Sequence, residues 1–241
     1  MNKKMKWHQL LQDNADLPRQ YHCAATDQEA IIWLYDVIGE DAWGGISAAR
    51  FVKDLQHITA PLIHLRINSP GGDVFDARAM VTAIKQHPAH IIVHIDGLAA
   101  SAASYIALAG DEVEMSDGAF FMIHNAWGLV VGNRHNLLDM AATLEKIDAS
   151  IVADYHKKTG LSLSQLEQWM DAETWFTAQE ALEAGFIDRI AAEKEHKPAA
   201  LHSWNLSAYA HPPNRLSQNP PPHILAEQSR LRRVHAIEQT A

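Results

Sequence analysis

Residues 62–72 read LIHLRINSPGG, and this stretch decides the fold class. Apolar residues alternate with polar ones from Leu62 to Asn68, which is the two-residue period of a half-buried β-strand. A Ser-Pro-Gly-Gly turn occupies residues 69–72, and apolar residues at helical spacing follow it from Val74 to Ile84. The stretch therefore predicts a strand, a sharp turn and a helix in direct succession.

Similar units surround this stretch along the chain. Runs rich in β-branched and aromatic residues predict further strands at Ala30–Val37, Ile91–Ile95, near Val113, at Phe120–His124 and at Phe186–Ile187. Helices are expected from Ile46 through Leu55 and, in an Ala/Ser-rich stretch suited to close packing on a sheet, from Gly97 to Leu108. Strands that alternate with helices indicate an α/β domain.

The second half of the chain favours helices. Residues 133–158 contain few helix breakers, so we expect one long helix that ends at Gly160. Ser162 and Thr177 each begin a capping-box pattern, and each predicts a shorter helix. The long helix carries an apolar stripe of Leu137, Met140, Leu144, Ile147 and Ile151.

The two ends of the chain differ in composition from its middle. Residues 1–27 are polar and irregular, and the first strong strand signal follows them. Beyond residue 193, prolines lie among polar residues, with a run at 220–222, which is typical of a flexible tail. We therefore predict a polar N-terminal segment at 1–27, a single folded domain at 28–193 and a Pro-rich flexible tail at 194–241.

Composition excludes several classes of protein. The chain has 241 residues, of which 47% are hydrophobic and 20% charged, as in an ordinary globular protein. Its net charge of −9 argues against a nucleic-acid partner, because such proteins need a clustered basic face. The single cysteine, Cys23, excludes an internal disulfide and favours a reducing compartment.

The sequence also argues against a membrane span, a metal site and a cofactor. No apolar run approaches the length that a spanning helix needs. The fifteen histidines lack a compact cluster with a carboxylate or thiolate, which a metal site requires. We expect neither a membrane partner, nor a metal, nor a cofactor.

Two sharp strand-to-helix transitions are the most informative features for chemistry. One is the turn at residues 69–72, and the other is Gly97–Ser101, which reads GLAAS. Glycine and the unpaired amides at a helix start can present backbone N–H groups to a ligand. Two such turns that converge would form an oxyanion hole. Taken singly, each is more typical of a plain turn or a closely packed helix.

Ser101 and His124 are candidates for nucleophilic catalysis. A serine that attacks a carbonyl needs a base within hydrogen-bond reach, and that base needs an acceptor on its other ring nitrogen. His124 ends an apolar strand, a position where active-site residues often lie. Asp171 and Glu173 precede the capped helix at Thr177, and either can supply the carboxylate. Taken alone, Ser101 is equally suited to cap a helix, and loop carboxylates are usually solvated.

Four ordered motifs resemble those of a known family. They are Ile67–Gly72, Gly97–Ser101, Met122–His124, and Thr177–Ala181 with Gly185 and Asp188. In order and spacing they resemble the Clp protease family of serine peptidases over residues 30–190. The resemblance implies a ClpP/crotonase-like spiral of ββα units, in which a long helix from Asn133 projects to contact other subunits.

The resemblance also implies roles for individual residues. By matching motifs, Ser101 corresponds to the nucleophile, His124 to the general base, and the amides of Gly72 and Ala102 to the oxyanion hole. At the third triad position the family has Asp, whereas this chain has Glu173. A Glu can play this part in related triads, and Asp171, two residues earlier, remains an alternative.

Some features resemble phage-encoded Clp-like proteases of the head-maturation type. They are the polar N-terminal segment, residues 39–45, the triplet Glu173–Trp175 and the Pro-rich tail. This resemblance implies a homo-oligomeric ring in the cytoplasm of a bacterial host, with virion association as a further option. Its substrates would be scaffold or capsid protein.

Three other functions stay open on the sequence alone. A cellular ClpP-like peptidase would need a separate ATP-driven unfoldase, because the chain carries no nucleotide-binding motif. A crotonase-type acyl-CoA enzyme would use the oxyanion donors without a nucleophilic serine. A catalytically idle assembly protein of the same fold would lack the alignment of Ser101 with His124.

Overall fold

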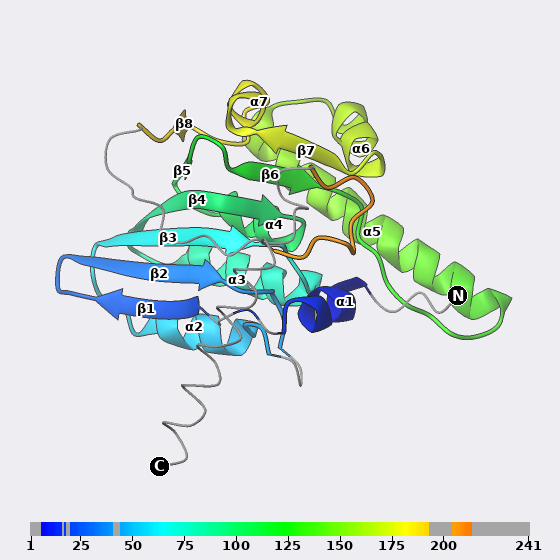
Figure 1. Ribbon diagram of the computed structural model, residues 1–241, viewed down its shortest axis with the longest axis horizontal. Helices are drawn as coiled ribbons and strands as arrows, with labels where there is room; N and C mark the ends of the chain where they lie inside the picture. Colours follow the sequence, from blue (N-terminus) through cyan, green and yellow to red (C-terminus); the bar gives the residue numbers. More distant parts are fainter. Residues whose placement is uncertain (1–5, 16, 18–19, 41–43, 193–203, 214–241) are drawn as a thin grey trace, which may run out of the picture.

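The computed structural model describes residues 6–15, 17, 20–40, 44–192 and 204–213. A β-sheet forms the central layer of this part of the chain, and helices pack against it (Figure 1). This arrangement is the α/β architecture that the alternation of strands and helices predicts.

The sheet is mixed, with a parallel centre. Its strands are β1 (Gln20–Ala25), β2 (Glu29–Tyr35), β3 (Leu62–Ser69), β4 (His90–Ala100), β5 (Glu112–Met115), β6 (Phe120–Ile123), β7 (Thr174–Thr177) and β8 (Arg189–Ile190). They follow the order β1-β2-β3-β4-β5-β8, and β6 pairs with both β4 and β7. Strands β2 to β5 run parallel, whereas β1 and β7 are antiparallel to their neighbours β2 and β6.

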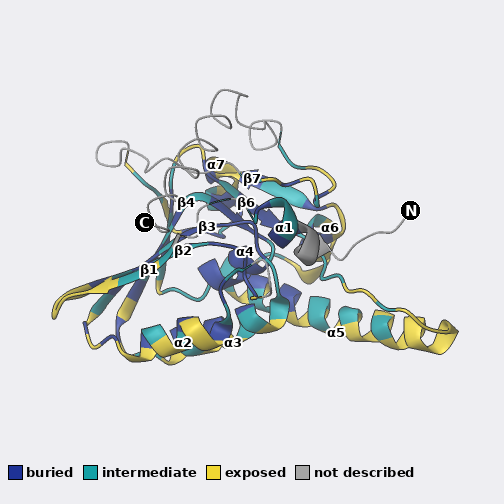
Figure 2. Ribbon diagram, turned by 60° about the horizontal axis from the view of Figure 1, so that its bottom comes forward, coloured by how far each residue is buried: buried dark blue, intermediate teal, exposed yellow. Residues whose placement is uncertain are grey.

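The described helices are α1 (Lys6–Asp13), α2 (Ala48–Gln56), α3 (Val74–Gln86), α4 (Ala102–Ala107), α5 (Arg134–Thr159), α6 (Leu163–Asp171) and α7 (Ala178–Glu183). The main hydrophobic core lies between the sheet and the inner faces of α2, α3 and α4, and it contains Phe51, Met80 and Ile106. Figure 2 shows these buried faces turned toward the sheet. Burial of this large apolar surface is the main favourable contribution to folding.

Several local predictions are confirmed. Burial alternates along β3, as the period of its sequence predicts. The long helix α5 starts after a capping box at Asn133 and ends at Gly160, which adopts the left-handed conformation. The Thr177 side chain accepts a hydrogen bond from Glu180 N, and that pattern starts α7.

The prediction of a helix over residues 97–108 is wrong in its first half. Strand β4 continues through Ala100, and α4 begins only at Ala102. Residues 98–100 pair with residues 120–122 of β6. Tertiary strand pairing therefore overrides the high helix propensity of alanine.

The last predicted strand is displaced along the chain. Phe186 and Ile187 are buried in the core rather than paired in the sheet. The strand lies instead at Arg189–Ile190, where it pairs with β5. Apolar character alone does not distinguish a strand from a buried connection.

Both ends of the chain are more structured than their composition predicts. The segment 1–27 contains α1 and β1, and residues 204–213 of the predicted flexible tail pack on the domain. A second hydrophobic cluster joins these two parts to the sheet, and its buried members are Leu10, Leu11, Val37, Leu98, Ala100, Met122, Leu206 and Tyr209. The burial of a few apolar side chains thus orders these two segments, although most of their residues are polar. Residues 194–203 and 214–241 of the tail, with their prolines, lie outside the described residues.

Helix α5 projects from the domain. Its second half buries Ile151, Val152 and Tyr155, whereas its first half extends beyond the sheet, with exposed residues at its tip (Figure 2). Leu137 and Leu138 in this first half are 52% and 55% exposed. These two leucines form an exposed apolar surface on the projecting half of the helix.

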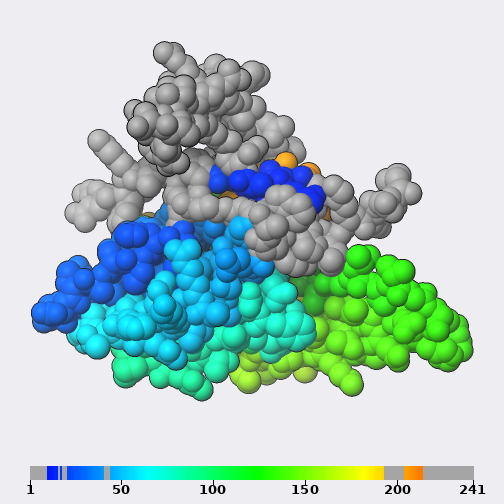
Figure 3. Space-filling model, turned by 90° about the horizontal axis from the view of Figure 1, so that it is seen from below, coloured from blue at the N-terminus to red at the C-terminus, as the bar shows by residue number. Residues whose placement is uncertain are grey.

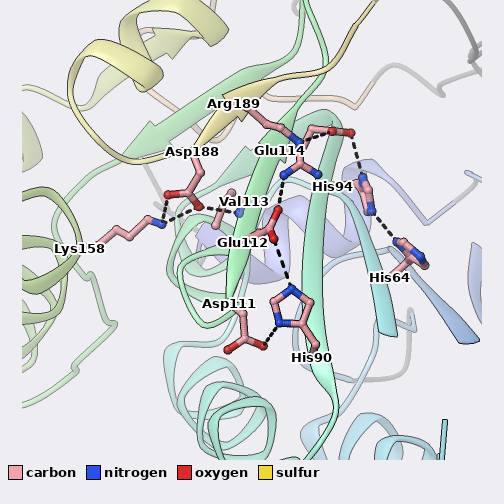
Figure 4. A network of polar contacts seen from close by, with 10 residues as sticks. All are labelled: His64, His90, His94, Asp111, Glu112, Val113, Glu114, Lys158, Asp188 and Arg189. Atoms are coloured by element: carbon pink, nitrogen blue, oxygen red, sulfur yellow. Dashed lines mark hydrogen bonds and ion pairs between the residues drawn. The ribbon is translucent and has the colours of Figure 1, made fainter. Parts of the chain in front are cut away.

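A network of polar contacts ties neighbouring strands together (Figure 4). Arg189 of β8 binds both Glu112 and Glu114 of β5. The Oε1 atom of Glu114 lies 3.1 Å from His94 Nδ1 on β4, and His94 Nε2 lies 2.9 Å from His64 Nδ1 on β3. Hydrogen bonds between side chains therefore link four strands across the sheet.

This network shifts the pKa values of two of its members. Burial lowers the pKa of His94 below the usual 6.5, and the nearby Arg66 charge acts in the same direction, against the hydrogen bond to Glu114. Burial alone would raise the pKa of Glu114, but hydrogen bonds from Arg189 and His94 lower it below the usual 4.5. Both groups bind a proton less readily in the folded state than in the unfolded state, so acid favours unfolding.

We predict that the wild-type protein loses stability below about pH 6.5 through His94, and further below about pH 4.5 through Glu114. His94→Gln should lose less stability than the wild type between about pH 7 and about pH 5, because its side chain does not titrate. Urea denaturation midpoints at both pH values measure this difference. Equal losses in the two proteins would contradict the role given to His94.

Candidate active site

Ser101 lies in a sharp turn between β4 and α4. Its backbone has φ 56° and ψ −122°, a region that residues other than glycine rarely adopt. The Ser101 amide donates to Met122 O over 2.9 Å, and the Ser104 hydroxyl donates to Ser101 O over 2.6 Å. The Ser101 side chain makes no capping bond to α4, so the helix-capping interpretation of this serine is wrong.

His124 directly follows β6, whose pairing with β4 and β7 fixes the place of the histidine. Its Nε2 atom lies 2.7 Å from Ser101 Oγ, which is a normal hydrogen-bond length for this pair. The predicted nucleophile and the predicted base are therefore in direct contact, although 23 residues separate them along the chain.

The turn after β3 lies beside the Ser101 turn. Ile38 N donates to Gly71 O, and Asp73 N donates to Ile38 O. Neither of these two backbone hydrogen bonds uses the Gly72 amide. Ala102 is the first residue of α4, where backbone amides have no acceptor within the helix. Gly72 and Ala102 line the same cavity as Ser101 and His124. The two predicted oxyanion donors are thus brought together with the serine.

The cavity has a volume of about 330 Å³. Its wall opposite the two turns consists of apolar side chains of α5 and of the connection before it, including Trp127, Met140, Leu144 and Ile147. An extended chain placed here could put an apolar side chain against α5 and a carbonyl carbon beside Ser101 Oγ.

The two candidate acids lie in different environments. Glu173 is 8% exposed and has a positive φ of 51°, whereas Asp171 accepts a 2.6 Å hydrogen bond from Asn125 Nδ2 at the surface. The Glu173 carboxylate accepts hydrogen bonds from the amides of Ala210 and His211. The two carboxylates thus differ in burial and in hydrogen-bond partners.

Tyr209 also belongs to this site, and it is not among the residues that the sequence motifs predict. Its ring lies edge-on to the His124 ring, with 5.5 Å between centroids, and its hydroxyl donates to Pro70 O. The signal available in the sequence was the group Trp204, Leu206 and Tyr209, three large apolar residues within a polar tail. Such a group favours a packed segment over a flexible one.

Ser104 is the other serine close to the site, one helical turn after Ser101. It is fully buried, and its hydroxyl is engaged by Ser101 O and the Tyr155 hydroxyl. This environment leaves Ser101 as the nucleophile candidate that faces the cavity.

Within the described ranges, no group of three or more His, Cys, Asp or Glu residues could hold a metal ion. A search of the same part of the chain finds no helix long and apolar enough to cross a membrane.

A serine hydrogen-bonded to a histidine at the edge of a cavity is an arrangement found in serine hydrolases. The Clp protease family model matches residues 20–194. The chain belongs to the Clp protease family, a family of serine peptidases.

Relatives and solved structures agree with this assignment. The chain is 30% identical over 164 residues to ATP-dependent Clp protease proteolytic subunit 2 of Mycolicibacterium paratuberculosis, covering 67% of this chain and 82% of that protein. It is also 30% identical over 176 residues to the proteolytic subunit of Streptococcus pneumoniae, covering 68% of this chain and 86% of that one. A mutant ClpP1 from Listeria monocytogenes has a TM-score of 0.60 at 23% identity, over 68% of this chain and 92% of that chain. This similarity confirms the ClpP-like fold.

We predict that Gly71→Ala destabilises the protein and removes the activity of the site. Gly71 has φ 93°, and an added Cβ would lie 2.5 Å from Ala100 O and 2.8 Å from Ser101 Cβ. The backbone penalty and the overlap together should cost roughly 2–4 kcal/mol and displace the nucleophile. Thermal denaturation and peptide hydrolysis measure the two effects.

Gly118→Ala is the matched control. Gly118 also has a positive φ, 81°, but no atom lies within 4 Å of an added Cβ. It should lose roughly 1 kcal/mol of stability and keep its hydrolytic rate. A Gly71→Ala variant with the wild-type rate would contradict the close approach of the two turns.

Proposed function

We propose that the protein is a serine endopeptidase that uses a triad of Ser101, His124 and Glu173. The observation that carries the proposal is the 2.7 Å contact between His124 Nε2 and Ser101 Oγ at a cavity that the Gly72 and Ala102 backbones also line. This contact favours a nucleophilic mechanism over the acyl-CoA chemistry of a crotonase, which would not need it. It also disfavours an idle assembly protein, because the pair is already aligned.

The geometry supports a two-stage hydrolysis. Ser101 Oγ attacks the carbonyl carbon of the peptide while its proton passes to His124 Nε2. The negative charge on the carbonyl oxygen is stabilised by the amides of Gly72 and Ala102. The imidazolium then gives its proton to the leaving amine, which departs and leaves an acyl group on Ser101. Water, deprotonated by His124, attacks this ester, the bond to Ser101 Oγ breaks, and His124 returns the proton to this oxygen as the second product leaves.

The acid holds the histidine in the productive tautomer and stabilises its charged form. Burial and two backbone donors favour Glu173 for this role, whereas the Asp171 carboxylate binds the Asn125 side chain at the surface. Asp171 remains the alternative to be tested against it.

We place the natural substrates among scaffold or capsid proteins of a phage, cleaved during head maturation. The support is the resemblance of the Glu173–Trp175 triplet and of the chain ends to the phage-encoded type, together with a C-terminal stretch that extends beyond the family match at residue 194. On this proposal the protein works in the cytoplasm of a bacterial host or in association with a virion. The relatives above, named as subunits of ATP-dependent proteases, support the second candidate, a cellular peptidase that works with an unfoldase.

We propose a homo-oligomeric ring as the working assembly. Members of the Clp family form such rings and act on protein substrates. In this chain the projecting half of α5, with its exposed Leu137 and Leu138, is the surface that a second copy would cover.

Ser101→Ala should abolish hydrolysis of a fluorogenic peptide while the protein keeps its fold. The Ser101 hydroxyl makes no capping bond, so its loss costs little stability. Circular dichroism and the steady-state rate are the measurements. A Ser101→Ala variant that still turns over would remove this serine from the mechanism.

The acid is tested by comparing Glu173→Gln with Asp171→Asn. Glu173→Gln should lower kcat by roughly 100-fold or more with little change in KM, because an amide can hold the wrong tautomer. Asp171→Asn serves as its control and should stay within a few fold of the wild type. The reverse ranking would transfer the role to Asp171, and wild-type rates in both single variants and in the double variant would indicate a Ser-His dyad.

Self-association is tested on the same helix. The double variant Leu137→Glu, Leu138→Glu should sediment as a smaller species than the wild type at micromolar concentration, because charge on an apolar contact is costly to bury. Leu163→Glu, an exposed leucine on α6, is the matched control and should leave the assembly unchanged. A wild type that sediments as a 26.8 kDa monomer would contradict the ring.

A further inference from the structure

Residues 204–213, which we term the C-terminal segment, lie against the turn that carries the oxyanion donor. Trp204 Nε1 donates to Asn68 Oδ1 over 3.2 Å, and the Tyr209 hydroxyl donates to Pro70 O. Pro70 directly precedes Gly71 and Gly72, and Asn68 lies two residues before Pro70. These two hydrogen bonds therefore hold the turn after β3 against the C-terminal segment.

The same segment contacts the base. Tyr209 is 7% exposed, and its ring packs edge-on against the rings of both His124 and Trp175, with centroids 5.5 and 5.7 Å apart. Burial raises the pKa of Tyr209, so its hydroxyl stays protonated and remains a donor. The Tyr209 ring thereby limits the orientations that the imidazole can adopt.

The segment also binds the acid. Ala210 N donates to Glu173 Oε2 over 3.0 Å, and His211 N donates to Glu173 Oε1 over 2.7 Å. Both carboxylate oxygens are held by consecutive backbone amides, which fixes the carboxylate plane. Between them, Tyr209, Ala210 and His211 thus contact the turn after β3, His124 and Glu173.

The other half of the segment is anchored to helix α1. Asn14 and Asn205 exchange two hydrogen bonds between side chain and backbone, and the Ser207 hydroxyl donates to Asp13 Oδ2. In Figure 3 the orange atoms of the segment lie beside the dark blue atoms of α1. This anchored unit lies outside the family match, which ends at residue 194.

The segment leaves the substrate cavity open. Among the described residues, the cavity beside Ser101 is lined by residues between Gly72 and Tyr155, and none of residues 204–213 contributes to its wall. A segment that blocked substrate would fill this space. The segment instead contacts the groups that surround the nucleophile, and its Tyr209 hydroxyl interacts with the Ser101 side chain.

We propose that Tyr209, together with the amides of Ala210 and His211, positions His124, Glu173 and the β3 turn for catalysis. The inference rests on the peptidase function proposed above. The Tyr209 hydroxyl interacts with the Ser101 side chain but transfers no proton in this scheme, so Tyr209 is a positioning residue rather than a catalytic one.

The test compares two variants that each remove one hydroxyl from the segment. Tyr209→Phe removes the donor to Pro70 O, whereas Ser207→Ala removes the donor to Asp13 on α1. Both are made in the full-length chain, and kcat, KM, melting temperature and the rate of inactivation by a fluorophosphonate are measured. Tyr209→Phe should lower kcat and the inactivation rate roughly tenfold with KM within about twofold of the wild type, and Ser207→Ala should keep both rates.

The outcomes are distinct. A Tyr209→Phe variant with the kcat and inactivation rate of Ser207→Ala would overturn the inference, because the hydroxyl that ties the segment to the β3 turn would then play no part in catalysis. An increase in either rate would also overturn it, since the segment would then be an inhibitory cover. A wild-type chain inert to both substrate and fluorophosphonate would overturn the proposed function itself, and the inference with it.

Discussion

The backbone of Ser101 has a positive φ of 56°, and the rest of the site depends on how this conformation is held. Such a conformation costs about 1–3 kcal/mol for a residue other than glycine. Hydrogen bonds on both sides of the residue offset this cost, because its amide donates to Met122 and its carbonyl accepts from the amide and the hydroxyl of Ser104. The turn therefore requires both the pairing of β4 with β6 and the start of α4.

This requirement accounts for the small residues around the serine. All six residues of α4 are buried, and Gly71 approaches Ala100 and Ser101 too closely for a Cβ atom. Strands β3 and β4 are parallel neighbours, so the turns that follow them meet at the same edge of the sheet. Gly72 and Ala102 line the same cavity for that reason, and His124 reaches it because β6 pairs with the last residues of β4.

Much of this arrangement is predictable from local sequence. The alternation in 62–68, the caps at Asn133 and Thr177, and the glycine at 160 act within a few residues, so the pattern alone places β3, α5 and α7. The serine and the histidine were found through ordered motifs, and the structure brings them together. Residues 97–100 were misassigned because their strand conformation depends on β6, which is distant in sequence.

The structure of the C-terminal segment also depends on residues that are distant in sequence. Tyr209 lies more than a hundred residues from Ser101, and the Pro-rich, polar residues around it favour a flexible chain. Its packing depends on Leu10 and Leu11 of α1, so neither end of the chain is ordered by its own composition. Long-range contacts between two short apolar groups have no periodic signal in the sequence.

The central claim is that Ser101, activated by His124, forms a covalent acyl intermediate. Mass-spectrometric mapping of the protein after reaction with a fluorophosphonate tests it most directly. The account predicts a single adduct on the peptide that contains Ser101, at this serine and not at Ser104, and no adduct when His124 is replaced by alanine. An adduct at another serine, or undiminished labelling without His124, would contradict it.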